Sequence, residues 1–194
     1  VGRLGGITPT DVAYTPVRFK NGVKGLLAKE EKAEYAKLKL DECFIDIGAK
    51  DKEEALKLVQ PGTYGCFVGE PEEFGDGLLK AKAIDDRAGC AIMLSLLRQD
   101  LPMDVTFAFT VQEEVGTRGA FGAAFSVTPE IGLVLETTTA ANLPDVEPHR
   151  QVCAPGKGPV ISYMDGSTFY DRPLFEKLRY LAESNDIPWP TKEY

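Results

Sequence analysis

The hydrophobic pattern of this 194-residue chain changes near residue 80. Before that point, short runs of β-branched and aromatic residues are separated by turn residues, and Asn21-Gly22 marks a hairpin. Asp51, followed three residues later by Glu54, has the spacing of a capping box and predicts a short helix that ends near residue 59. We therefore predict a small β-barrel or sandwich domain over residues 1–79, with strands at 17–19, 23–27, 43–47 and 64–68.

Residues 80–194 alternate between strand-like and helix-like patterns. The run VTFAFTV at 105–111 is apolar and β-branched throughout, as expected of a strand that is buried on both faces. This alternation predicts an α/β domain with a mostly parallel sheet flanked by helices. Its predicted strands are 78–84, 105–111, 131–135 and 159–163, and its predicted helices are 87–98, 118–125 and a helix from the cap Asp171 to about residue 184.

The composition excludes several classes of protein. The chain has 30 acidic and 22 basic residues and a net charge of -8, which argues against nucleic acid as a partner. No apolar run reaches the roughly 18 residues that would span a bilayer, so we expect no membrane association. The four cysteines are widely spaced and lie in apolar stretches, which indicates buried free thiols and a cytoplasmic location. They are Cys43, Cys66, Cys90 and Cys153.

Carboxylates follow three of the predicted strands. Asp85-Asp86, Glu113-Glu114 and Glu136 each stand where a strand ends, and ligands of open α/β sheets bind outside the carboxyl ends of the strands. One acidic residue in such a place is usually a helix cap or a solvated loop residue. Five of them converging would repel one another unless a cation held them, and hard oxygen ligands favour a divalent metal. The sequence therefore predicts a metal site.

These motifs, taken together, resemble the tetrahedral-assembly (TET) family of cytoplasmic metallo-aminopeptidases, once described as endoglucanases. The resemblance covers essentially the whole chain in the family's order. Two segments of the first part resemble the family's inserted β-barrel, which serves dimerisation. The matching segments are KAIDDRAG (82–89), TVQEEVGTRGA (110–120), the run that ends in Glu136, GKGPVIS (156–162), VRFKNGVKG (17–25) and FIDIGA (44–49).

The resemblance implies a two-metal aminopeptidase that hydrolyses N-terminal residues from peptides. Asp85 would bridge two divalent ions, zinc or cobalt, while Glu114 would ligate one ion and Glu136 the other. Glu113 would be the general base that takes a proton from the metal-bridging water, and Asp86 would orient the neighbouring groups. The family also implies a homo-oligomer that forms through the barrel domain.

Histidine sets this chain apart from the family pattern. The family has one ligand histidine upstream of the barrel insert and another near the C-terminus, whereas this chain has a single histidine, His149, which matches neither. We therefore expect the chain to be a fragment that lacks both ends, with His149 an ordinary surface residue. We also expect weak metal binding and little aminopeptidase activity from these 194 residues alone.

Two other functions stay open on the residues. Asp85 and Glu113 could serve as the acid and nucleophile of a glycoside hydrolase. That reading leaves the doubled carboxylates unexplained, and the chain has one tryptophan, Trp189, for stacking on a sugar. The chain could also be non-catalytic and act through its barrel as an assembly module.

Overall fold

The computed structural model describes residues 7–192, which divide into two compact units, unit 1 up to Glu136 and unit 2 from Thr137 onward. The predicted domain boundary after residue 79 lies inside the first unit. No helix within the described range is both long and apolar enough to cross a bilayer.

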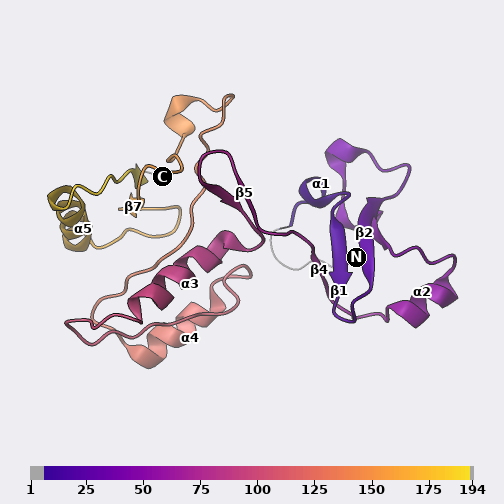
Figure 1. The fold of residues 1–194 in the computed structure, drawn as a ribbon, viewed down its shortest axis with the longest axis horizontal. Coiled ribbons are helices and arrows are strands. Elements are labelled where there is room, and N and C mark those ends of the chain that lie inside the picture. The colour runs from indigo at the N-terminus through magenta and orange to yellow at the C-terminus, as the bar shows by residue number, and fades with distance from the viewer. Residues whose placement is uncertain (1–6, 193–194) are drawn as a thin grey trace. The chain divides into compact units, whose positions relative to one another are not determined.

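A four-stranded sheet organises the first part of unit 1 (Figure 1). The strand order is β3-β2-β1-β4, and every neighbouring pair is antiparallel. These strands lie where the sequence pattern predicts them, and the described residues form an open sheet. Their bounds are β1 Pro16–Phe19, β2 Lys24–Lys29, β3 Cys43–Asp46 and β4 Gly65–Phe67.

The Asn21-Gly22 hairpin is confirmed, and local chemistry explains it. Gly22 has a φ of 90°, which glycine adopts without steric cost. The Asn21 side chain accepts a hydrogen bond from the Val23 amide at 3.2 Å, and this contact closes the turn. The resulting register pairs Val17 with Gly25, where a Cβ would lie 2.6 Å from the Asp46 carbonyl oxygen. Glycine at 25 therefore lets β2 and β3 approach closely.

A small core lies on one face of this sheet. Val17, Leu27, Leu38 and Cys43 are 2–6% exposed and form one cluster. Val17 and Phe19 alternate along β1 with exposed residues, as the strand period requires. Of the four cysteines, which are all free, Cys43 is buried as predicted, and its burial raises the pKa of its thiol. The prediction was wrong for Cys66, which is exposed because its strand position faces away from the core.

Short elements surround the sheet. The predicted helix is confirmed as α2, Lys52–Leu58, and the Asp51 side chain accepts a hydrogen bond from the Glu54 amide at 2.8 Å. The other short elements are the helix α1, Pro9–Val12, and two 3₁₀ helices, Tyr35–Lys37 and Leu40–Glu42.

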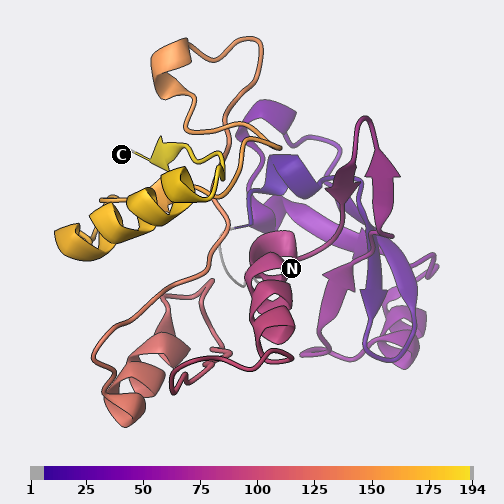
Figure 2. The ribbon, with the colours of Figure 1, turned by 60° about the vertical axis from the view of Figure 1, so that its left-hand side comes forward.

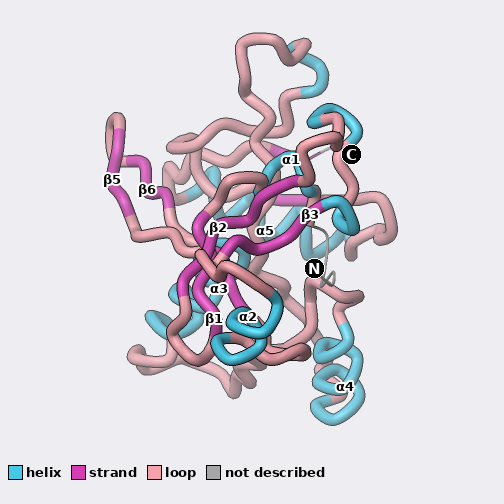
Figure 3. The backbone as a smooth tube through the Cα atoms, turned by 90° about the vertical axis from the view of Figure 1, so that its right-hand side faces the viewer, coloured by secondary structure: helices cyan, strands magenta, loops and turns pink. Residues whose placement is uncertain are grey.

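A second hairpin follows the sheet, and the sequence pattern did not predict it. β5, Glu72–Phe74, pairs antiparallel with β6, Leu78–Lys80 (Figure 3). Gly75 and Gly77 in the turn have φ values of 56° and 70°. The predicted strand 78–84 is therefore only three residues long, because the chain turns into a helix at residue 84.

The rest of unit 1 consists of two helices joined by long loops (Figure 2). α3, Ile84–Leu96, and α4, Arg118–Val127, confirm the predicted helices. The predicted strands 105–111 and 131–135 are not formed in this structure, since neither run makes ladder hydrogen bonds within the described residues. Their apolar side chains are correspondingly exposed, with Val111 at 70% and Val134 at 77%. A strand needs neighbours to hydrogen-bond, and periodicity cannot supply them.

Unit 2 is built around one amphipathic helix. α5, Arg172–Ser184, begins at its predicted cap, since the Asp171 carboxylate accepts a hydrogen bond from the Leu174 amide at 2.8 Å. Phe175 is buried and meets Tyr163 edge to face, with ring centroids 5.8 Å apart. The remaining elements are the 3₁₀ helix Pro148–Arg150 and the strands β7, Ile161–Ser162, and β8, Thr191–Lys192, which form the one parallel pair in the described structure.

Candidate metal centre

The Asp85-Asp86 pair lies in the first turn of α3. Both residues have non-helical backbone angles, and the peptide bond between them is cis. The Asp86 carboxylate accepts a hydrogen bond from the Gly89 amide at 3.0 Å, so it acts as a cap inside the helix. Asp85 is exposed and Asp86 half-buried. The two carboxylates therefore have different surroundings, because Asp86 binds the helix backbone while Asp85 is exposed to solvent.

Gly89 is the residue that permits this cap. It is buried, and a Cβ there would overlap the Asp86 carboxylate, with Oδ1 only 2.8 Å away. Sequence reasoning used the acidic pair and missed the glycine. The signal was present in the spacing, since Gly89 stands three residues after Asp86, the distance that a capping side chain reaches.

Glu113 and Glu114 lie on a tight turn between the 105–111 run and α4. The Glu113 carbonyl accepts hydrogen bonds from the amides of Gly116 at 2.9 Å and Thr117 at 2.8 Å. Gly119 donates its amide to the Val111 carbonyl at 2.9 Å, and a Cβ on Gly119 would lie 2.5 Å from that oxygen. The motif's glycines therefore fold the chain back on itself. Both glutamates are exposed.

Glu136 is the last residue of unit 1 and is exposed. It follows the run 131–135, as predicted, although that run is not a strand here. His149 lies in unit 2, in the 3₁₀ helix Pro148–Arg150, and its side chain is exposed.

The described residues do not bring these carboxylates into one cluster. Within residues 7–192, no three His, Cys, Asp or Glu side chains lie close enough together to hold a metal ion. The donor chemistry suits a hard divalent cation, because carboxylate oxygens are available on three separate segments. The geometry does not suit such a cation, because those three segments do not lie side by side as strands of one sheet. The arrangement therefore does not fit a metal centre as it stands, and the assigned roles remain predictions.

The chain is similar to known proteins over almost its whole length. The sequence profile described as M42 glutamyl aminopeptidase matches residues 3–194. A curated Acetivibrio thermocellus protein with a provisional aminopeptidase name is 40% identical over 189 residues, which are 96% of this chain and 56% of that protein.

Two solved structures extend the match to the fold. A TET aminopeptidase from a marine sediment Thaumarchaeota archaeon has a TM-score of 0.90 at 31% identity, over 98% of this chain and 58% of that one. The Pyrococcus horikoshii TET1 peptidase, described as assembling into a tetrahedron or a large octahedral shell, has a TM-score of 0.73 at 28% identity, over 97% of this chain and 59% of that one.

These likenesses define an α/β fold of the TET aminopeptidase class. The chain belongs to the peptidase M42 family, so the resemblance seen in its motifs is confirmed. It spans about half the length of the curated relatives that it matches.

Proposed function

We propose that the protein to which this chain belongs is a metal-dependent aminopeptidase that removes N-terminal residues from peptides in the cytoplasm. The observation that carries the proposal is the family match, which runs over residues 3–194 and so spans all of the acidic motifs. The aminopeptidase relatives are about twice as long as this chain, so activity is proposed for the whole protein.

The proposed division of labour follows the acidic motifs. Asp85, Glu114 and Glu136 are the carboxylates that would hold the divalent ions, which we propose to be two zinc or cobalt ions. Glu113 would accept the proton of the attacking water and deliver it to the leaving amine, as a general base must. Asp86 would act as a positioning residue, since its carboxylate binds the Gly89 amide and fixes the turn next to Asp85.

A mostly parallel sheet is the arrangement that would draw these carboxylates together. We propose that the runs 105–111 and 131–135 are strands of that sheet in the whole protein. Their exposed apolar side chains support this, because Val111 at 70% and Val134 at 77% are more exposed than a stable surface favours over several residues. Residues 80–194 would then form part of the catalytic domain.

Residues 1–79 would form the barrel-like insert through which the protein self-associates. Two TET-family structures are described as large assemblies, a dodecamer and a tetrahedral or octahedral shell, and they are the basis for this part of the proposal.

The function is tested by assaying the whole protein on a panel of aminoacyl 4-nitroanilides, with aryl glycosides as the control substrates. We expect turnover of the anilides that stops on chelation and returns with zinc or cobalt, and no turnover of the glycosides. Glycoside hydrolysis that is insensitive to chelator would overturn the proposal in favour of the paired-carboxylate alternative.

A further inference from the structure

Unit 1 contains a pocket of about 520 Å³ that the proposed peptidase chemistry does not use. It lies beside β1 and β4, and its lining combines residues of these strands with residues of the segments that follow β4 and enter α3. Its polar and charged lining comes from Arg18, Lys20, Tyr64, Cys66, Lys82 and Arg87, and the rest of its lining is apolar, with Phe19 and Phe67 the largest members. We call it the basic pocket.

The strand period explains why cations gather there. Along β1, Val17 is buried in the core, so the next residue, Arg18, is exposed on the other face, and Lys20 is exposed just after the strand ends. Arg18 pairs across the ladder with Cys66, and the Lys20 amide donates to the Tyr64 carbonyl at 3.1 Å. β1 and the residue that follows it thus present two cations, and Lys82 and Arg87 add two more.

The charge of the basic pocket is not balanced by the protein. Among the residues that the structure describes, no acidic side chain lines the pocket, although the chain as a whole carries a net charge of -8. Within residues 7–192, none of the four cations forms an ion pair, whereas Lys37, Lys57 and Lys80 each pair with a nearby glutamate. Four unpaired cations held around one cavity repel one another, and an anion with several charges would relieve this repulsion.

One wall of the basic pocket is aromatic. The Tyr64 ring is 62% exposed, and the Lys20 ammonium lies 5.5 Å from its centroid. A ring face beside a cation can hold a planar group as well as the charge that follows it. The volume falls within the range of small-molecule sites, which is roughly 300–1,000 Å³.

We propose that the basic pocket binds a small molecule that carries two or more linked phosphate groups. Linked phosphates supply three to four negative charges within a short span, which matches four cations better than single carboxylates do. The arginine guanidinium forks of Arg18 and Arg87 suit phosphate oxygens, and the two lysines add point charges. The ligand is either an inorganic polyphosphate or a nucleotide, and the two share this chemistry.

The test is calorimetric titration of the full chain with inorganic tripolyphosphate, in metal-free buffer because polyphosphates chelate divalent ions. ATP, orthophosphate and citrate form the other arms. We expect tripolyphosphate and ATP to bind more tightly than orthophosphate and citrate, with affinity falling as salt rises. Tighter binding of ATP than of tripolyphosphate would identify a nucleotide, with its base near Tyr64, and equal binding would identify the phosphates alone as the ligand. Citrate binding as tightly as tripolyphosphate would overturn the choice of phosphate.

A matched pair of variants separates the pocket from general surface charge. Arg18→Gln/Lys82→Gln removes two cations from the pocket, and Lys52→Gln/Arg98→Gln removes the same two residue types from exposed sites elsewhere. The first pair should raise the Kd for tripolyphosphate by about tenfold or more, and the second should change it by less than about twofold. Equal effects of the two pairs would show that binding is non-specific and would overturn the proposal.

Cys66 provides a second readout that does not depend on a variant. Its thiol is exposed and lines the pocket, whereas Cys43 is buried. Saturating tripolyphosphate should slow alkylation of Cys66, as followed by peptide mass spectrometry, and leave the rate at Cys153 unchanged. An unchanged rate at Cys66 under saturating ligand would place the bound anion elsewhere and contradict the proposal.

Discussion

Unit 1 contains two kinds of apolar segment with opposite outcomes. In the four-stranded sheet, Val17 and Leu27 are 4% and 2% exposed, and each strand pairs with a neighbour. In the runs 105–111 and 131–135, side chains of the same types are 45–77% exposed at Val105, Phe109, Val111, Ile131, Leu133 and Val134. Both kinds have strand-forming composition. The difference is that each strand of the sheet has a neighbouring strand to hydrogen-bond with. Turns and loops between these strands bring their edges together, whereas the two exposed runs have no such neighbour within the described residues.

The largest contrast should appear when one leucine is truncated in each segment. Leu27→Ala should lower the free energy of unfolding by about 2–5 kcal/mol, since it opens a cavity in the core cluster. Leu133, which is 62% exposed, makes the matched control, and Leu133→Ala should change stability by no more than about 0.5 kcal/mol. Urea unfolding measures both. A comparable loss from Leu133→Ala would mean that the 131–135 run is packed in solution.

A smaller effect is expected at the cap of α2. Asp51→Ala removes the acceptor of the Glu54 amide, which should cost about 1 kcal/mol of stability. Asp100→Ala removes the same charge from an exposed loop and serves as the control, with little change expected. If both variants lose equal stability in the same unfolding measurement, the cap contributes only through its charge.

A loop in unit 2 contains two titratable side chains with shifted pKa values, so its stability should depend on pH. The Asp165 carboxylate accepts hydrogen bonds from the Tyr170 hydroxyl at 2.6 Å and from the Ser167 and Thr168 amides, which lower its pKa from 3.8 to about 2. The same bond to Asp165 raises the pKa of Tyr170 to about 12.

The sign of each effect follows from these shifts. A lowered carboxyl pKa stabilises the folded loop above pH 4, and that stability should be lost as the pH falls from about 4 to 2. The raised tyrosine pKa contributes below pH 10, and its contribution should be lost as the pH rises toward 12. Tyr170→Phe should move the Asp165 pKa back toward 3.8, as read by carbon NMR titration. An unmoved value would mean that the backbone amides alone hold it down.

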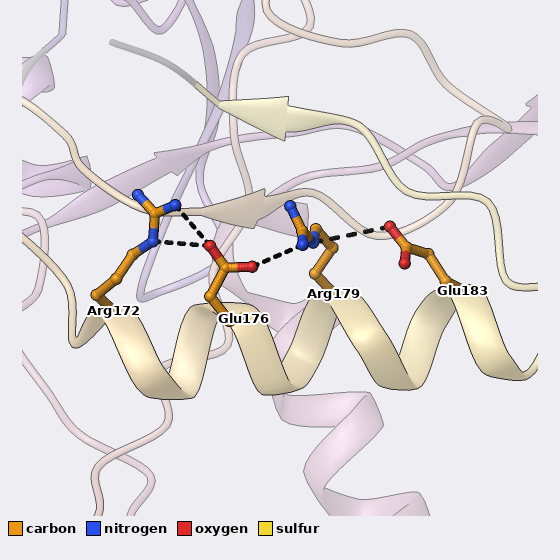
Figure 4. A network of polar contacts seen from close by, with 4 residues as sticks. All are labelled: Arg172, Glu176, Arg179 and Glu183. Carbon is orange, nitrogen blue, oxygen red and sulfur yellow. Dashed lines mark hydrogen bonds and ion pairs between the residues drawn. The ribbon is translucent and has the colours of Figure 1, made fainter.

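The smallest effect is expected in the partly exposed ion-pair network along α5 (Figure 4). Glu176 lies between Arg172 at 2.6 Å and Arg179 at 2.9 Å, and Arg179 also faces Glu183 at 3.7 Å. Glu176→Gln should cost no more than about 1 kcal/mol, because ion pairs that remain accessible to solvent are weak. The cost should shrink further in 1 M salt, where charges are screened within about 3 Å. A cost that is independent of salt would point to packing.

Local signals in the sequence predicted much of this fold. Asn21-Gly22, the Asp51 and Asp171 caps and the helix periods of α3, α4 and α5 all predicted elements that the structure contains. The hairpin β5–β6 was not predicted, because its strands Glu72–Phe74 and Leu78–Lys80 are short and exposed. Neither has a buried face that would produce an alternating hydrophobic pattern.

The candidate site was harder to predict, for a related reason. The motif residues lie on the turns and helix starts that their glycines and caps favour, as with Asp86 and Gly89. Their convergence depends on which strands become neighbours, and such pairing is set by distant parts of a chain. The apolar pattern around Val111 and Val134 predicts that these residues are buried, but it does not indicate which other strand they pack against.

The measurement that tests the account most directly compares Glu113→Gln with Glu114→Gln in the whole protein, with bound metal and kcat read on the same preparations. Glu113→Gln should retain its metal while kcat falls by roughly 10²–10⁴, the usual effect of removing a positioned general base. Glu114→Gln should lose metal together with activity. Loss of metal from Glu113→Gln and retention by Glu114→Gln would contradict the assignment of the base and the ligand.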